Sequence, residues 1–193
     1  MLRHWLMEGT PHAFSDIPML FEVIRAWLSA RLEINPLEIK LIGSARTGFS
    51  LAPPPDFGRP FDSNSDLDIA AVSTSLYSRC KLAFEQWRTD YQSGIVAPRN
   101  AREKSFWDEN LVVGANSLQR GFLDSNKLPT FDRYPIAQTI SQSMWLLKNK
   151  LDISPSSPTI RKATIRVYNS WHSFHKQVKT NFNRANTIAA NSA

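Results

Sequence analysis

The stretch SDLDIAAV at residues 65–72 decides the fold class. Its polar–apolar alternation, followed by an apolar end, predicts a β-strand over 66–72. Side chains alternate between the faces of a strand, so Asp66 and Asp68 share one face while Leu67 enters the core. Neighbouring carboxylates repel unless a cation neutralises them, and Mg²⁺ prefers such oxygen ligands. The pair predicts a magnesium site, although two acids on a solvent-facing strand edge would give the same pattern.

A second short strand precedes this one and ends in a glycine–serine turn. The run 38–42 alternates in polarity and predicts the strand, and Gly43 and Ser44 follow it directly. The backbone N–H groups and the hydroxyl of such a turn can hold phosphate oxygens, and glycine allows a phosphate to approach the backbone closely. Arg46 could add a charge-assisted contact. The turn alone is a weak signal, but the turn followed by a strand with two aspartates is more specific.

The two motifs together resemble the signature of the nucleotidyltransferases of the DNA polymerase beta superfamily. Ile42-Gly43-Ser44 matches its apolar residue and glycine–serine pair, and Asp66-Leu67-Asp68-Ile69 matches its strand with two acids. The resemblance implies that Gly43 and Ser44 bind the triphosphate, with Arg46 beside them. It implies that Asp66 and Asp68 bind metal ions, Mg²⁺ or Mn²⁺. The implied reaction transfers a nucleoside monophosphate from a nucleoside triphosphate such as ATP to an acceptor hydroxyl and releases pyrophosphate.

The spacing between the two motifs departs from the minimal members of this superfamily. Twenty-one residues separate Ser44 from Asp66, which is more than in those members. The extra residues, around 52–62, are rich in Pro, Gly, Asp and Ser and predict a loop. A longer loop costs little stability, so the strands on either side can keep their pairing. Such spacings resemble the branch that makes signalling oligonucleotides, although this chain is too short for the large helical lobe of those enzymes.

The third acid is the second departure. Active members carry a third carboxylate on a neighbouring strand, where it activates the attacking hydroxyl. Asp124 follows a predicted strand over 119–123 and is the first choice for this role. Asp108 and Glu109 fall in a predicted helix, and Asp132 lies in a proline-flanked loop. If none of them reaches the metal site, the alternative is an inactive member that acts as a binding or regulatory subunit.

The remaining apolar patterns predict an α/β (α+β) fold, with a small mixed sheet flanked by helices. Apolar residues recur at helical spacing over 16–34 and 75–91, and a helix is also expected over 99–114, where the periodicity is weak. Two further helices, 136–151 and 157–185, are joined by a short connection, which predicts an antiparallel helical pair. The expected division is therefore a nucleotidyltransferase core over 1–133, a C-terminal helical pair over 134–185 and a frayed tail over 186–193.

The net charge of +6 is concentrated near the C-terminus. No Asp or Glu follows Asp152, whereas basic and acidic residues balance in the rest of the chain. Such a segment attracts phosphates of a nucleotide or a nucleic acid, although a solvated helix face without a partner would have the same composition. The candidates for weak nucleic-acid or phosphate binding are Arg161, Lys162, Arg166, Lys176 and Lys179.

Composition also limits where the chain acts and on what. No apolar run is long enough to span a membrane, and a single cysteine, Cys80, cannot form an internal disulfide, so we expect a cytoplasmic protein. The expected partners are a nucleoside triphosphate and, as acceptor, a nucleic acid, a nucleotide, a small molecule or a partner protein. The last of these would make the chain an antitoxin-type protein nucleotidyltransferase.

Overall fold

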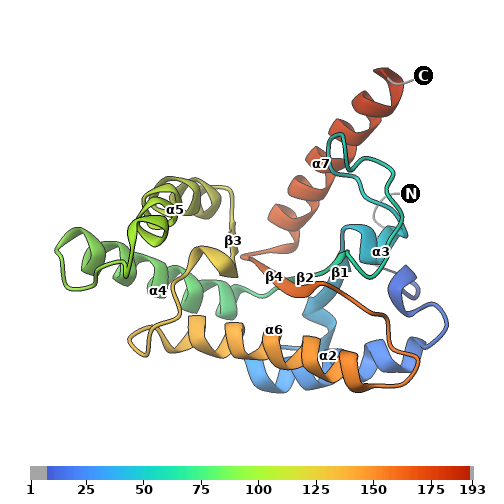
Figure 1. Cartoon of the computed structure of the whole chain (residues 1–193), viewed down its shortest axis with the longest axis horizontal. Coiled ribbons are helices and arrows are strands. Elements are labelled where there is room, and N and C mark those ends of the chain that lie inside the picture. The colour runs from blue at the N-terminus through green and yellow to red at the C-terminus, as the bar shows by residue number, and fades with distance from the viewer. Residues whose placement is uncertain (1–7, 192–193) are drawn as a thin grey trace.

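The computed structural model describes residues 8–191, in which a four-stranded mixed sheet is flanked by helices (Figure 1). In spatial order the strands are β1 (Ile39–Ile42), β2 (Asp66–Val72), β4 (Lys162–Tyr168) and β3 (Phe122–Asp124). β1 is antiparallel to β2, β2 is parallel to β4, and β3 is antiparallel to β4. The α/β class and the two strands expected over 38–42 and 66–72 are confirmed.

Six α-helices surround the sheet in residues 8–191. The helices expected over 16–34, 75–91, 99–114 and 136–151 are confirmed, although α5 continues to Gln119. None of the described helices is both long enough and apolar enough to cross a membrane. The helices are α2 (Pro18–Leu32), α3 (Ser44–Thr47), α4 (Thr74–Gln92), α5 (Ala101–Gln119), α6 (Pro135–Ile153) and α7 (Trp171–Asn191), with 3-10 turns η1 (His12–Phe14), η2 (Pro36–Glu38) and η3 (Ser125–Lys127).

Local signals direct the chain from α2 into β1. Pro18 occupies the first turn of α2, where its missing N–H group has no helical partner to lose. The helix ends at Glu33, which adopts the left-handed conformation with φ 56°. Asn35 then caps η2, because its side chain accepts from the Leu37 amide at 2.8 Å while its own amide donates to Glu38 at 3.0 Å. β1 begins directly after this turn, which fixes its start beside β2.

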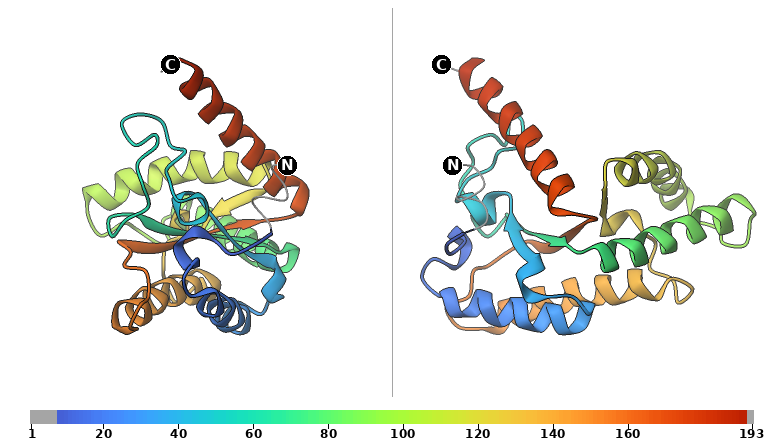
Figure 2. Two further views of the ribbon diagram at one scale, coloured as in Figure 1. Left: turned by 90° about the vertical axis from the view of Figure 1, so that its right-hand side faces the viewer. Right: turned by 180° about the vertical axis from the view of Figure 1, so that it is seen from behind.

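The two faces of the sheet are covered differently. On one face, Leu67, Ile69 and Ile165 are buried in the main core beneath the sheet, where α2 and α6 lie side by side (Figure 2). The other face carries a smaller apolar cluster near the start of α7. The polar residues Asp66 and Asp68 lie farther along this second face. The cluster consists of Ala70, Val72, Phe122, Tyr168 and Phe174.

The C-terminal helical pair is the main error of the sequence interpretation. The segment expected as one helix over 157–185 forms β4 and then α7. Residues 164–167 alternate in burial at a period of two, with Ile165 and Val167 in the core, and β-branched residues favour a strand. The same segment also carries apolar residues at helical spacing, and this second pattern led to the wrong prediction of a helix. Since β4 pairs with both β2 and β3, a boundary at residue 134 would divide the sheet.

The other differences concern element ends. The strand expected over 119–123 is β3 at Phe122–Asp124, because α5 holds the chain in a helix through Gln119 and Gly121 then turns it at φ 81°. Asp124 is therefore the last residue of the strand rather than a residue after it. The tail expected over 186–193 to be frayed is helical through Asn191, and residues 192–193 lie outside the described part.

Candidate functional site

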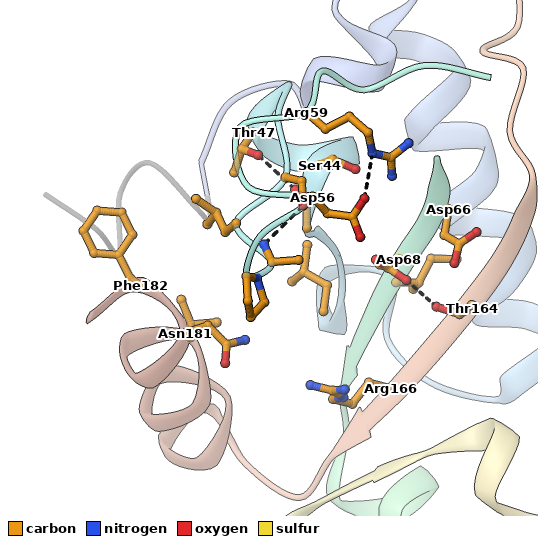
Figure 3. Close-up of a pocket in the computed structure, with 18 of the residues that line it drawn as sticks. Ser44, Thr47, Asp56, Arg59, Asp66, Asp68, Thr164, Arg166, Asn181 and Phe182 are labelled. Carbon is orange, nitrogen blue, oxygen red and sulfur yellow. Dashed lines mark hydrogen bonds and ion pairs between the residues drawn. The ribbon is translucent and has the colours of Figure 1, made fainter. Parts of the chain in front are cut away.

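A pocket of about 420 Å³ opens on the second face of the sheet, at the end where the aspartates lie (Figure 3). Its walls come from the β1–α3 turn, from β2, β3 and β4, from the loop at 50–59, and from α7. Motifs that are far apart in the sequence therefore meet around one space. The residues expected at the site that line this pocket are Gly43, Ser44, Asp66, Asp68, Asp124, Arg161 and Arg166.

The two aspartates of β2 have different surroundings, although they share a face as expected. Asp66 accepts two hydrogen bonds from the Arg161 guanidinium, at 2.9 and 3.0 Å, and Lys162 Nζ lies 3.6 Å away. Asp68 is opposite Thr164 in the parallel register and accepts a hydrogen bond of 2.6 Å from its hydroxyl. Protein cations therefore neutralise Asp66, whereas a neutral hydroxyl holds Asp68.

This difference perturbs the protonation of Asp68. Burial raises the pKa of the Asp68 carboxyl above its ordinary value, and repulsion from Asp66 raises it further. The Thr164 hydrogen bond and the charges of Arg166 and Lys162 oppose this shift of the pKa without cancelling it. The Asp68 carboxylate is therefore the acid of the pocket that would gain most from an added cation.

Gly43 lies directly against Asp68. Ile42 pairs with Asp68 in the antiparallel register, so the next residue turns across the end of the acidic strand. Gly43 adopts φ 63°, and a Cβ atom built on it would lie 2.9 Å from Oδ2 of Asp68. Only glycine meets both conditions without strain. Ser44 follows at the start of α3 and lines the same pocket (Figure 3).

The long connection between the two motifs is a loop whose two ends are joined by backbone hydrogen bonds. The Ser50 amide donates to the Arg59 carbonyl at 2.8 Å, and the Gly58 amide donates to the Ser50 carbonyl at 2.9 Å. The Phe61 amide then donates to the Gly48 carbonyl at 2.8 Å. These bonds close the insertion on itself and leave the β1–β2 pairing intact. The loop also brings Asp56 and Arg59 to the pocket as an ion pair of 3.4 Å.

Asp124 lines the pocket from the far side of β4. Its carboxylate makes a bidentate pair with Arg166, with distances of 2.6 and 3.1 Å. Burial lowers the pKa of Arg166, but the Asp124 carboxylate outweighs burial and raises it above the ordinary value. Asp124 pairs with Arg166, which pairs with Ala70, so the backbone at Asp124 is two strand spacings, roughly 10 Å, from that at Ala70 and farther from that at Asp68. The role of Asp124 as third acid stays a prediction.

The remaining expected residues lie in two other places. Arg46 donates to the carbonyl oxygens of Gly9, at 2.8 Å, and of Glu8, and it lines a different cavity. Lys176 and Lys179 are exposed on α7. The basic residues of the C-terminal segment thus belong to several elements and not to one helix face, because β4 carries part of the set.

The sequence interpretation missed several residues of this pocket. Thr164, which holds Asp68, fell within the helix expected over 157–185. The period-two alternation of 164–167 was the signal that could have placed it on the polar face of a strand. Asn181 and Phe182 of α7 also line the pocket, and Figure 3 shows both facing the loop at 50–59. No sequence pattern distinguishes them from other positions of that helix.

The pocket offers a cation only two close carboxylates. Within residues 8–191, no group of three or more His, Cys, Asp or Glu side chains is arranged to hold a metal ion. Asp66 and Asp68 could still share a cation whose other ligands came from a bound anion or water. The chain matches no protein-family model, no curated protein and no solved structure, so the resemblance to the nucleotidyltransferases rests on the two motifs and their placement.

Proposed function

We propose that this pocket binds a nucleoside triphosphate together with a divalent cation and transfers the nucleoside monophosphate to an acceptor hydroxyl, releasing pyrophosphate. The contact between Gly43 and Asp68 is the observation that carries this proposal. It joins the glycine–serine turn to the acidic strand, although twenty-one residues of loop separate the two motifs. In the superfamily that the sequence resembles, these motifs bind the triphosphate and the metal ions.

The donor set fits a magnesium or manganese ion. Asp66 and Asp68 would hold it, and Asp68 has no cation within ion-pair distance among the described residues. The ion would neutralise the triphosphate and lower the pKa of the acceptor hydroxyl. The Gly43 backbone and the Ser44 hydroxyl would bind phosphate oxygens, since the turn lines the same pocket as the carboxylates.

Arginines supply the anion-binding part of the pocket. Arg59 lines it from the loop at 50–59, Arg161 from the residue before β4 and Arg166 from β4, and each already contacts an aspartate. Guanidinium groups hold phosphate oxygens through several donors, and a bound triphosphate would share them with those acids. Positioning and charge stabilisation would then provide most of the rate acceleration, as in other phosphoryl-type transfers.

The pairing of Asp124 with Arg166 favours a second function, nucleotide binding without transfer. An acid held by two hydrogen bonds from a guanidinium is a poor acceptor for the proton of an attacking hydroxyl. If Asp124 stays in that pair, the pocket would bind the triphosphate and the cation as a regulatory subunit. The two functions make the same prediction for binding and opposite predictions for turnover.

The test is a binding and turnover experiment on the full chain. Wild type is titrated with each of the four ribonucleoside triphosphates in Mg²⁺ or Mn²⁺ by calorimetry, and pyrophosphate release is followed with and without added RNA. Asp68→Asn should lose release while keeping its fold, and Asp132→Asn, an exposed acid outside the pocket, should behave as wild type. Binding without release would establish the regulatory function, whereas absence of binding with either ion would overturn both.

The RNA arm of this experiment addresses the acceptor. Lys176 and Lys179 are exposed on α7, whose farther residues Asn181 and Phe182 line the pocket. A nucleic-acid acceptor would place its phosphates along these lysines, and its affinity would fall as salt rises because counterions are released. Release that depends on added RNA supports this acceptor, and release without RNA indicates a nucleotide, small molecule or protein instead.

A further inference from the structure

A second cavity, of about 320 Å³, shares no lining residue with the proposed nucleotide pocket. Its walls come from α2, from β1, from α3 and from residues 9–11. α3 contributes to both spaces, because Ser44 and Thr47 line the pocket while Arg46 lines the cavity. The charged side chains that line the cavity are Glu22, Arg25, Lys40 and Arg46.

Arg25 lines this cavity and has one unsatisfied donor. The side chain is only 8% exposed, its Nε donates to the Pro36 carbonyl at 3.1 Å, and its Nη1 donates to both Glu22 oxygens at 2.8 and 2.9 Å. Nη2 is buried and has no hydrogen-bond partner in the described part of the chain. A buried polar group without a partner is destabilising, so a ligand oxygen there would be favoured.

Lys40 adds a second cation. Burial lowers the pKa of the half-buried Lys40 amine, and the charges of Arg25 and Arg46 lower it further, while Glu22 acts in the opposite direction. Arg46, which also lines the cavity, donates to the carbonyl oxygens of Glu8 and Gly9. Three cations therefore act on one another here, and Glu22 is the one carboxylate among the side chains that line the cavity.

We propose that this cavity binds the phosphate group of a small molecule. An oxyanion in the cavity would accept from the Lys40 amine and from the Arg25 guanidinium, and would relieve the repulsion among the cations. Met19, Phe21 and Leu41 line the same cavity and offer an apolar surface to an organic body beyond the phosphate. The site is independent of the proposed nucleotide pocket, although an occupant would contact the helix that carries Ser44.

Calorimetry with inorganic phosphate, on the full chain without nucleotide or divalent cation, tests the site. Lys40→Gln removes the cation and keeps most of the side-chain length, so we expect affinity to fall about tenfold, the scale of one hydrogen bond to a charged group. Lys150→Gln removes the same charge from an exposed position of α6 and should change affinity by less than about twofold. Equal affinity in wild type and Lys40→Gln would overturn the proposal.

A second variant is expected to bind phosphate more tightly, a result that loss of folding could not produce. The Glu22 side chain is 55% exposed and competes for Arg25, so Glu22→Gln should tighten phosphate binding several-fold. In NMR, bound phosphate should raise the pKa of the Lys40 amine, because the anion stabilises its charged form. Weaker binding in Glu22→Gln, or a Lys40 pKa that phosphate does not move, would contradict the proposed contact.

Two further arms separate this site from the nucleotide pocket and identify the source of the phosphate. Asp68→Asn and Ser44→Ala should keep phosphate affinity, and Lys40→Gln should keep triphosphate affinity in Mg²⁺. If phosphate binding followed Ser44 instead of Lys40, the anion would belong to the first pocket and the second site would be excluded. Phenyl phosphate that binds more tightly than inorganic phosphate indicates an organic phosphate, and equal affinity indicates the free ion.

Discussion

The two cavities that α3 helps to line differ in how their charges are balanced. In the proposed nucleotide pocket Asp56, Asp66 and Asp124 each pair with an arginine, and Asp68 remains with a hydroxyl partner. The side chains that line the second cavity include three cations, Arg25, Lys40 and Arg46, and one carboxylate, Glu22. The first space therefore suits a ligand that brings a cation together with its anion, such as a magnesium–triphosphate complex. The second suits an anion alone.

The largest expected effect concerns Gly43, the residue that joins the two motifs of the pocket. Gly43→Val should weaken triphosphate binding about a hundredfold or more, because a clash with Asp68 and a side chain at positive φ each cost roughly 1–3 kcal/mol. Gly94→Val is the matched control, since Gly94 also has positive φ, at 77°, but meets nothing within 4 Å. It should lose stability and keep triphosphate affinity.

The same variant sharpens the contrast with the second cavity. Phosphate binding without a divalent cation should persist in Gly43→Val, because Gly43 does not line that cavity. Loss of both ligands together would mean that the two spaces are one coupled site, and would break the comparison. Triphosphate affinity that survives in Gly43→Val would remove the phosphate-binding role of the turn.

The next effect concerns the arginine pairs of the first pocket. Arg166→Met should lower the free energy of unfolding by about 2 kcal/mol, since it leaves Asp124 without its guanidinium where both side chains are nearly three-quarters buried. Arg161→Met should cost no more than about 0.5 kcal/mol, because Arg161 is 64% exposed and its pair with Asp66 is screened by solvent. Urea denaturation of both variants measures the difference.

A double variant tests whether the loss in Arg166→Met comes from the unpaired acid. Arg166→Met combined with Asp124→Leu removes both charges and should recover part of the stability. No recovery would show that Arg166 contributes through packing on Phe122, whose ring lies 4.9 Å from its guanidinium carbon, instead of through Asp124. In that case Asp124 would be freer to act as the third acid.

A smaller effect concerns the hydroxyl of the turn. Ser44→Ala should weaken triphosphate binding by about 1–2 kcal/mol, the scale of a hydrogen bond to a charged group. Ser78→Ala is the control, because Ser78 lies on α4 outside the pocket and its hydroxyl donates to the Thr74 carbonyl of its own helix. Calorimetry that gives the same affinity for Ser44→Ala and wild type would leave the backbone of the turn as the whole phosphate contact.

The sequence was sufficient for the β1–β2 half of the pocket for a physical reason. The strand 66–72 has both a strict alternation at its polar end and a buried apolar end, and the two aspartates follow from that alternation. The approach of Gly43 to Asp68 follows from the antiparallel register, which the short turn and the apolar pattern specify together. The intervening loop does not affect this register, because it closes on itself between Gly48 and Phe61.

The β3–β4 half of the pocket could not be predicted from the sequence, also for a physical reason. In 157–185, apolar residues occur at positions that satisfy a helix and a strand at once, and a proline after serine resembles a helix start. The deciding interaction is the pairing of β4 between β2 and β3, which depends on residues about 40 and 95 positions earlier in the chain. Arg46 was expected beside Gly43 and Ser44 but lines the second cavity, and no pattern in the neighbouring sequence indicates that position.

The smallest expected effect separates Asp68 from the other acids of the first pocket through pH. The folded state raises the pKa of Asp68 above the ordinary value of 3.8. Between that value and the raised one, the folded chain binds more protons than the unfolded chain, so the contribution of Asp68 to the free energy of unfolding falls as pH rises. Asp68→Asn cannot titrate and should lose this slope, whereas Asp132→Asn should retain it.

Urea denaturation of both variants at a series of pH values above 3.8 measures the difference. A divalent cation with triphosphate should reverse the trend in wild type, because it stabilises the charged form of Asp68. If Asp68→Asn kept the slope of wild type, the Asp68 carboxyl would already be neutralised within the protein, and the pocket would have lost its reason to bind a cation.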